Sequence, residues 1–296
     1  MIPIRYVEPV FRPPSEAESL ILPVTDGCSW NECTFCEMYT APQKKFRARD
    51  EAEVLESIRL TGERYGDQVQ RVFLADGDAT VLPTRRLLDI LAAIRTHLPA
   101  VRRISSYCLP RNLRKKSQAE VDELAAAGLS MVYVGAESGD DRVLAAVDKG
   151  ETFETTRAAL DKLGAAGITR SVMILNGLGG KVYSRQHAEN SARLANAAQP
   201  EYLATLVVSF PLGEQRFRSG FPEWEPLSQH ELFVETEQLL SALELERTVF
   251  RSDHASNWLV LKGTLGADKA RLLAQVRQAI EHPEKARLRP AWARGL

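Results

Sequence analysis

The sequence lacks the features that mark a nucleic-acid-binding, membrane or secreted protein. Its 38 lysines and arginines are balanced by 39 aspartates and glutamates, so the formal net charge of −1 offers no cationic surplus for nucleic acid. It contains no run of about 18 apolar residues that would cross a membrane. No long apolar core follows the first residues, as a secretory signal peptide would require. We therefore expect a cytoplasmic protein with neither membrane nor nucleic-acid partners.

Cysteine is scarce, yet three of the four cysteines lie within nine residues. Cys28, Cys33 and Cys36 form a C-x4-C-x2-C pattern, and Cys108 stands alone. Clustered thiols in a reducing cytosol indicate metal binding or catalysis more than disulfides. Iron–sulfur clusters are usually held by four cysteines, so three predict a metal site with one iron open. Structural zinc is the alternative, although it usually takes four closed ligands.

Short apolar runs alternate with amphipathic segments along the chain. We expect strands at 20–24, 71–75, 103–107, 131–135, 171–176 and 202–209. Helical patterns occupy 50–65, 83–98, 117–127, 152–166, 184–198 and 228–243. This alternation predicts an α/β fold in which helical crossovers join parallel strands into a partial (β/α)6 TIM-like barrel.

Three parts are expected along the chain. Residues 1–18 contain four prolines and predict an extended arm. Residues 19–213 would form the core partial barrel. Residues 214–296 would form a small α+β extension that closes the barrel and contributes to the substrate site.

Polar residues and glycines follow each expected strand. Because the chemistry of such barrels gathers at the carboxyl ends of the strands, these segments are the candidate site. They are Cys28 to Cys36, Asp76 to Asp78, Ser106 to Asn112, Glu137 to Gly139, Gly177 to Gly180, and Pro211 to Gly213.

These segments resemble the radical S-adenosylmethionine (SAM) superfamily. The matching residues are the cysteine loop with Phe35 before its last cysteine, Gly77-Asp78, Val134 to Gly139, and Ile174 to Gly180. The Gly-x-Glu-Ser-Gly stretch is most similar to the branch that holds methylthiotransferases, the Elongator acetyltransferase subunit and many iron–sulfur oxidoreductases. The family's usual spacing is C-x3-C-x2-C, and this chain has one more residue between Cys28 and Cys33.

The resemblance implies the cofactors and their ligands. Cys28, Cys33 and Cys36 would bind three irons of a [4Fe–4S] cluster, and SAM would chelate the fourth. The other cofactor-binding residues that it implies are Phe35, Asp76, Gly77, Asp78, Ser106, Glu137, Gly177, Leu178 and Gly179. Of these, Asp76 to Asp78 would meet the SAM amino group, Ser106 the ribose, and Gly177 to Gly179 the adenine.

The resemblance also implies the reaction. An electron donor such as flavodoxin or ferredoxin would reduce the cluster, and SAM would be cleaved to a 5′-deoxyadenosyl radical that abstracts hydrogen from a small or medium-sized substrate. With only Cys108 left over, the additional cluster of a methylthiotransferase is not expected. The alternatives are a zinc-stabilised binding or scaffold protein and a pure electron carrier.

The candidates for catalysis are His254, Asn257 and Glu137, the last of which is also a candidate cofactor-binding residue. His254 and Asn257 lie in a polar segment, 250–258, between apolar runs, and histidine suits proton transfer near neutral pH. The alternative is a loop whose polar groups cap one another. Glu137 follows an apolar strand and would either serve the site or pair with a cation. His187 is expected on a helix surface.

Overall fold

The computed structural model describes residues 3–295, which form two compact units. Unit 1 contains Met38–Val134, Asp161–Arg170 and the described part of Met1–Asn31. Unit 2 contains Glu32–Glu37, Gly135–Leu160 and the described part of Ser171–Leu296. Because each unit draws on several stretches of chain, the units do not test the three-part division at residues 18 and 213, which stays a prediction.

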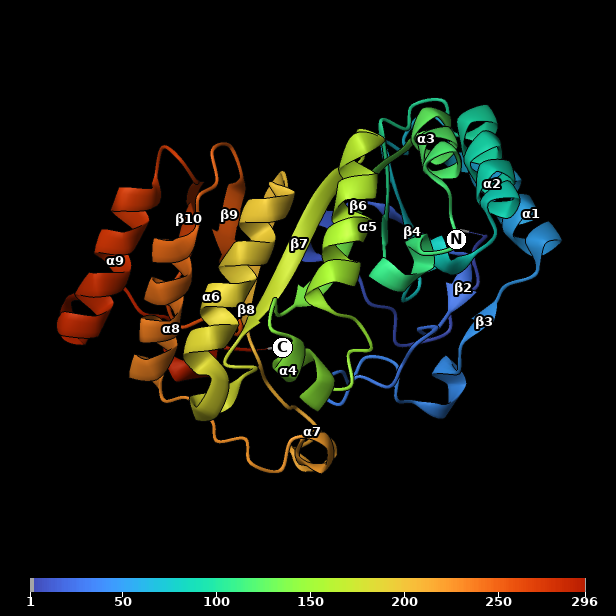
Figure 1. Cartoon of the computed structure of the whole chain (residues 1–296). Coiled ribbons are helices and arrows are strands. Elements are labelled where there is room, and N and C mark those ends of the chain that lie inside the picture. The colour runs from blue at the N-terminus through green and yellow to red at the C-terminus, as the bar shows by residue number, and fades with distance from the viewer. Residues whose placement is uncertain (1–2, 296) are drawn as a thin grey trace. The chain divides into compact units, whose positions relative to one another are not determined.

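Unit 1 is built on parallel strands in the order β1-β4-β5-β6. They are β1 (Leu20–Pro23), β4 (Arg71–Ala75), β5 (Arg103–Tyr107) and β6 (Leu129–Glu137), whose last three residues belong to unit 2. The helices α1 (Glu51–Tyr65), α2 (Thr84–His97) and α3 (Gln118–Ala127) lie side by side (Figure 1). Each buries an apolar stripe, with Ile58 and Ile90 fully covered. A capping box of Ser117 and Glu120 starts α3.

Shorter elements complete unit 1. An antiparallel pair joins β2 (Thr25–Asp26) to β3 (Arg47–Ala48). The 3-10 helices are η1 (Pro14–Glu16), η2 (Pro42–Lys44), η3 (Ala79–Val81) and η4 (Pro110–Leu113). The proline-rich arm therefore includes one helical turn. Its Glu16 is buried, accepts a hydrogen bond of 2.5 Å from Tyr133 and pairs with Arg103.

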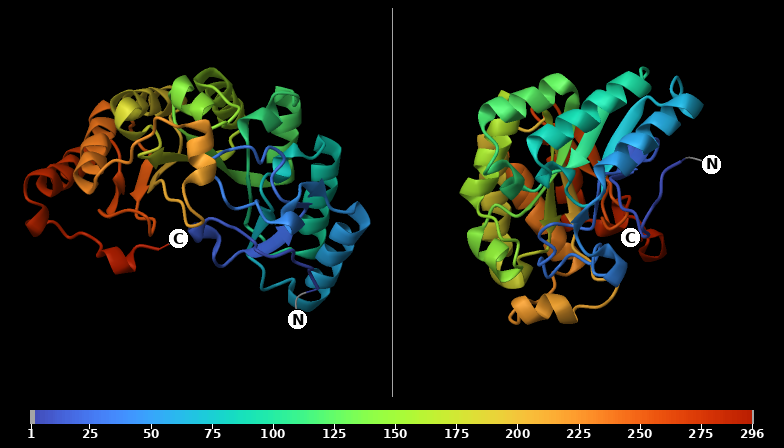
Figure 2. Two further views of the ribbon diagram at one scale, coloured as in Figure 1. Left: turned by 90° about the horizontal axis from the view of Figure 1, so that it is seen from below. Right: turned by 90° about the vertical axis from the view of Figure 1, so that its right-hand side faces the viewer.

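Unit 2 contains β7 (Thr169–Asn176, whose first two residues belong to unit 1), β8 (Tyr202–Val207), β9 (Val249–Ser252) and β10 (Leu261–Thr264), in that order. The pairs β7–β8 and β8–β9 are parallel, whereas β9–β10 is antiparallel. Its helices are α4 (Asp141–Ala146), α5 (Phe153–Ala165, partly in unit 1), α6 (Gly180–Ala198), α7 (Gln215–Gly220), α8 (Gln229–Ala242) and α9 (Lys269–Glu281), with η5 (Pro283–Lys285) and η6 (Ala291–Ala293). Figure 2 shows α6, α8 and α9 along one face of these strands.

The α/β class and all six predicted strands are confirmed, with boundaries within about two residues. Among the six predicted helices the one large difference is α6, which begins at Gly180 instead of Ser184 because the glycine stretch itself forms its first turn. The helices α4, α7 and α9 lie outside the predicted ranges. The expected surface position of His187 is wrong. Its side chain is 1% exposed, and its Nδ1 lies 2.8 Å from Ser138 Oγ. Burial lowers its pKa to about 4, which keeps the ring neutral.

Within residues 3–295, none of the helices combines the length and the apolar character needed to cross a membrane. The cytoplasmic location stays a prediction.

Candidate active site

The turn after β4 lies directly against the first cysteine. Gly77 N donates a hydrogen bond of 3.0 Å to Gly27 O. A Cβ atom at Gly77 would lie 2.9 Å from Cys28 Cβ and 2.7 Å from Gly27 O, so only glycine fits here. The sequence prediction that Gly77 and the cysteine loop belong to one site agrees with this contact inside unit 1.

Two buried aspartates of the same turn hold the cysteine loop. Asp78 accepts hydrogen bonds from Ser29 N at 3.0 Å and Asn112 Nδ2 at 3.3 Å, and from Ser29 Oγ. Asp76 pairs with Lys44 at 2.5 Å and accepts a hydrogen bond from Gly27 N at 3.3 Å. Burial raises the pKa of both carboxyls, that of Asp78 to about 6. Both therefore orient the backbone on either side of Cys28, and their contact with SAM stays a prediction.

In unit 2, a buried ion pair lies beside the second half of the cysteine loop. Lys149 Nζ is 3.1 Å from Glu137 Oε1, and the two side chains are 5% and 12% exposed. The same ammonium lies 5.7 Å from the centre of the Phe35 ring. Burial lowers the pKa of Lys149, but Glu137 and the thiols of Cys33 and Cys36 outweigh it, so the pKa is raised and the lysine stays charged.

Glu137 reaches Lys149 because its backbone is unusual. Its φ of 63° is left-handed, which costs free energy in a residue other than glycine. Gly135 lacks the side chain that would block it, since a Cβ there would lie 2.0 Å from Glu137 Oε1. The Gly-Ala-Glu order therefore places the Glu137 carboxylate over its own strand, where it pairs with a cation. A role of Glu137 in catalysis or cofactor binding stays a prediction.

The glycine stretch after β7 is fixed by residues that the sequence analysis missed. Gly177, at φ 81°, donates its N–H to Glu235 Oε1 at 2.6 Å, and its carbonyl accepts from Trp224 Nε1 at 3.1 Å. Ser184 Oγ donates to Glu235 Oε2 at 2.6 Å. Gly177 and Trp224 also line a cavity of about 240 Å³, whose other walls are Val207, Val208, Ser209, Phe210, Glu214, Pro226, Leu227 and Leu232.

We expect Glu235→Gln to change the pH dependence of stability. Burial raises the pKa of Glu235 from 4.5 to about 7, so the stability present below pH 4.5 is lost as pH rises to 7. An uncharged glutamine can accept from Gly177 N through its amide oxygen and donate its amide N–H to Ser184 Oγ. Its free energy of unfolding should therefore exceed that of the wild type by on the order of 3 kcal/mol at pH 8 and be equal near pH 4.5. Urea unfolding at several pH values measures this, with Glu237→Gln on the same helix as control. Parallel curves would refute it.

Three other predicted residues, Ser106, His254 and Asn257, each make at least one hydrogen bond within the fold. Ser106 is fully buried, and its Oγ donates to Leu74 O at 3.0 Å. His254 Nδ1 lies 2.9 Å from Ser256 Oγ, and burial followed by the Arg289 charge lowers the pKa of His254. Asn257 Nδ2 donates to Thr205 O at 2.8 Å, while its buried Oδ1 has no partner within residues 3–295. Catalysis by His254 and Asn257 stays a prediction.

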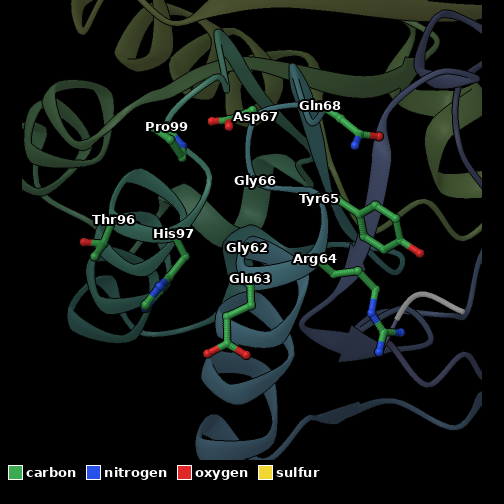
Figure 3. Close-up of a pocket in the computed structure, with 10 residues that line it drawn as sticks. All are labelled: Gly62, Glu63, Arg64, Tyr65, Gly66, Asp67, Gln68, Thr96, His97 and Pro99. Carbon is green, nitrogen blue, oxygen red and sulfur yellow. The ribbon is translucent and has the colours of Figure 1, made fainter.

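Another cavity, of about 420 Å³, lies away from these residues. Figure 3 shows it at the carboxyl ends of α1 and α2, between Gly62–Gln68 and Thr96–Pro99. Each helix is followed by a strand, so the cavity lies at the amino-terminal ends of these strands. In such folds the loops that carry chemistry lie at the opposite, carboxyl ends. We therefore do not assign the site to this cavity.

Comparison with known families decides the assignment. The family model of the Radical SAM superfamily matches residues 22–195, which include the cysteine loop, the turn at Gly77 and the glycine stretch. The chain belongs to the radical SAM superfamily. No curated protein sequence matches it.

Solved radical SAM structures resemble the chain at low sequence identity. The methyltransferase TsrM from Kitasatospora setae, solved with cobalamin and a [4Fe–4S] cluster, has a TM-score of 0.52 and 20% identity over 63% of this chain and 34% of its own. Coproporphyrinogen III oxidase (HemN) from Escherichia coli has a TM-score of 0.56 and 16% identity over 75% and 52%. Methylornithine synthase (PylB) has a TM-score of 0.55 and 14% identity over 92% and 74%. This chain thus spans about a third of the methyltransferase, and these likenesses confirm the predicted fold.

Radical SAM membership implies a [4Fe–4S] cluster and SAM, and the donor chemistry fits the cluster. Within residues 3–295 none of the four cysteines forms a disulfide, and three lie on one loop with a buried cation beside Cys33 and Cys36. Gly77 leaves space for close approach at Cys28. In the described part of the chain, no group of three histidine, cysteine, aspartate or glutamate side chains is arranged so that it could hold a metal ion. Ligation by the three cysteines therefore stays a prediction.

Proposed function

We propose that this chain is a radical SAM enzyme that cleaves SAM reductively and uses the resulting 5′-deoxyadenosyl radical to abstract hydrogen from a small or medium-sized substrate. The observation that carries the proposal is the matched domain at residues 22–195, within which the Gly77 backbone lies against Cys28. The cluster and SAM, when bound, would supply the one-electron chemistry.

The protein residues would hold and shield these groups. Cys28, Cys33 and Cys36 would ligate the cluster. The Lys149 ammonium would offset part of the negative charge of the thiolates, which favours reduction of the cluster. Asp78 and Asp76 would keep the backbone around Cys28 in place. An electron donor such as flavodoxin or ferredoxin would supply the electron.

Anaerobic reconstitution with iron and sulfide tests the proposal. After reduction with dithionite and addition of SAM, the protein should form 5′-deoxyadenosine, measured by liquid chromatography. An intact cluster that yields no 5′-deoxyadenosine would contradict SAM cleavage. A preparation that binds about one zinc and takes up no iron would support the scaffold alternative instead.

A further inference from the structure

One face of the unit 2 sheet is only partly buried, and its composition points to a class of ligand. On β7 and β8, Val172 and Leu203 face the helices and are buried. The alternate residues Met173, Leu175, Ala204 and Leu206 point to the other face and are half-exposed. This second face, which we call the open face, therefore presents an apolar surface.

The strand register places two cations at the edge of this apolar surface. Met173 is opposite Ala204, Ala204 is opposite Arg251, and Arg251 is opposite Lys262, so the four form one row across β7 to β10. Arg251 and Lys262 are both exposed. Side chains opposite one another in register lie on the same face, so the apolar row ends in two positive charges.

Arg251 has no anionic partner of its own among the described residues. Lys262 pairs with Asp253 at 2.8 Å, but no carboxylate within residues 3–295 lies at ion-pair distance from Arg251, whose Nη1 contacts only Phe250 O, at 3.3 Å. A guanidinium presents a planar set of donors that matches a carboxylate or phosphate. Arg251 is therefore available to hold an anionic group.

Two arginines of the C-terminal segment add positive charge beside the loop that follows β9. Arg289 donates to the carbonyls of His254 at 2.5 Å and Asn257 at 2.8 Å. Arg294 donates to Ser256 O at 2.9 Å and lies over Trp258, 3.7 Å from its ring centre. Both guanidiniums bind carbonyls, and within residues 3–295 neither has a carboxylate at ion-pair distance. Asp253 is the one acidic residue of the loop.

The apolar surface is continuous with the candidate active site in unit 2. Leu175 and Val208, at the carboxyl ends of β7 and β8, pack against a buried cluster that also receives Phe35, the neighbour of Cys36. The cluster is Val143, Val147, Leu178, Phe217, Phe221 and Trp224. A molecule on the open face would therefore extend from Arg251 toward the residues around the cysteine loop.

We propose that the substrate is an amphipathic anion that binds on the open face. Its apolar body lies on Met173, Leu175, Ala204 and Leu206, and its carboxylate or phosphate binds Arg251. This inference rests on the proposed function for the identity of the ligand as substrate. The positive charge of Arg251 and the apolar residues beside it, however, belong to unit 2 whether or not the chain cleaves SAM.

Three probes with one apolar body test the inference. They are 1-naphthylacetate, 1-naphthyl phosphate and the neutral 1-naphthylacetamide, titrated calorimetrically into the anaerobically reconstituted full chain. At least one anion should bind about tenfold tighter than the amide, and Arg251→Gln should remove that difference. Leu206→Ser should weaken all three probes. The anion that binds tighter identifies the group as carboxylate or phosphate.

The matched control is Arg185→Gln, which removes an exposed arginine from α6 on the helix-covered side. It should leave all three affinities within about twofold of the wild type, whereas a general charge effect would lower the anion affinities equally in both variants. Equal binding of anions and amide, or an unchanged Arg251→Gln variant, would overturn the proposal. So would absence of binding together with a dimer in light scattering, because the face would then be a contact between copies.

Failure of this inference is distinguishable from failure of the proposed function. The wild-type preparation used for calorimetry is also reduced and given SAM. Anion binding without 5′-deoxyadenosine would refute radical chemistry and leave the anion site standing. Formation of 5′-deoxyadenosine without a preference for anions would refute only the substrate class.

Discussion

Replacing Cys36 by serine should abolish the cluster and the activity together. A serine oxygen is a poor ligand for iron in place of a thiolate, and two cysteines do not retain a [4Fe–4S] cluster. After reconstitution, iron should fall from about four per chain to below one, the absorption near ~400 nm should disappear, and 5′-deoxyadenosine should fall at least about a hundredfold. Iron analysis, absorption spectra and chromatography measure the three quantities.

Cys108 provides the matched control for this experiment. It is the remaining cysteine, 1% exposed at the end of β5, and its Sγ lies 3.6 Å from Leu109 O. Cys108→Ala should keep full iron content and activity, because a buried lone cysteine behaves as a small apolar residue. If Cys108→Ala loses iron while Cys36→Ser keeps it, the assignment of the ligands is wrong.

The strands and most helices are predictable because their signals are local. A buried parallel strand is a short apolar run, and a helix shows apolar spacing with a cap at its start. The capping boxes at Ser117 and Ser228 both form. By contrast, β2 and β3 have two residues each, and an ion pair between Asp26 and Arg47 supports their pairing. Strands this short and polar cannot be detected from hydrophobic periodicity.

The partners of the site residues were harder to predict, because they are distant in sequence. Lys44 pairs with Asp76 from 32 positions away, and only the folded chain brings them together. Glu235 did leave a signal that the sequence analysis missed. It lies between Leu232 and Leu239 on the buried stripe of α8, where a carboxylate is costly unless bonded. His187 lies on the buried stripe of α6, which is marked mainly by small residues such as Ala188 and Ala192.

Breaking the buried pair of Lys149 and Glu137 should be far more costly than breaking a surface pair. Glu137→Gln would leave the Lys149 ammonium buried without its carboxylate, and the loss of one buried partner typically costs about 3–5 kcal/mol. Lys149→Met should also destabilise the protein. The double variant should lose less than the sum, because neither charge then remains unpaired. Urea unfolding of the cluster-free chain under reducing conditions gives the free energy of unfolding for each variant.

The cluster adds a second expectation to the same cycle. The thiols of Cys33 and Cys36 act on Lys149 together with Glu137, so cluster thiolates should partly replace the missing carboxylate. The loss of thermal stability caused by Glu137→Gln should therefore be smaller in the loaded protein than in the cluster-free one. Arg185→Gln breaks an exposed pair and should cost less than about 1 kcal/mol in both forms. If Glu137→Gln lowers the free energy of unfolding no more than this control does, the Lys149 ammonium does not need the Glu137 carboxylate as a partner. The ion pair would then not be what holds β6 beside the cysteine loop.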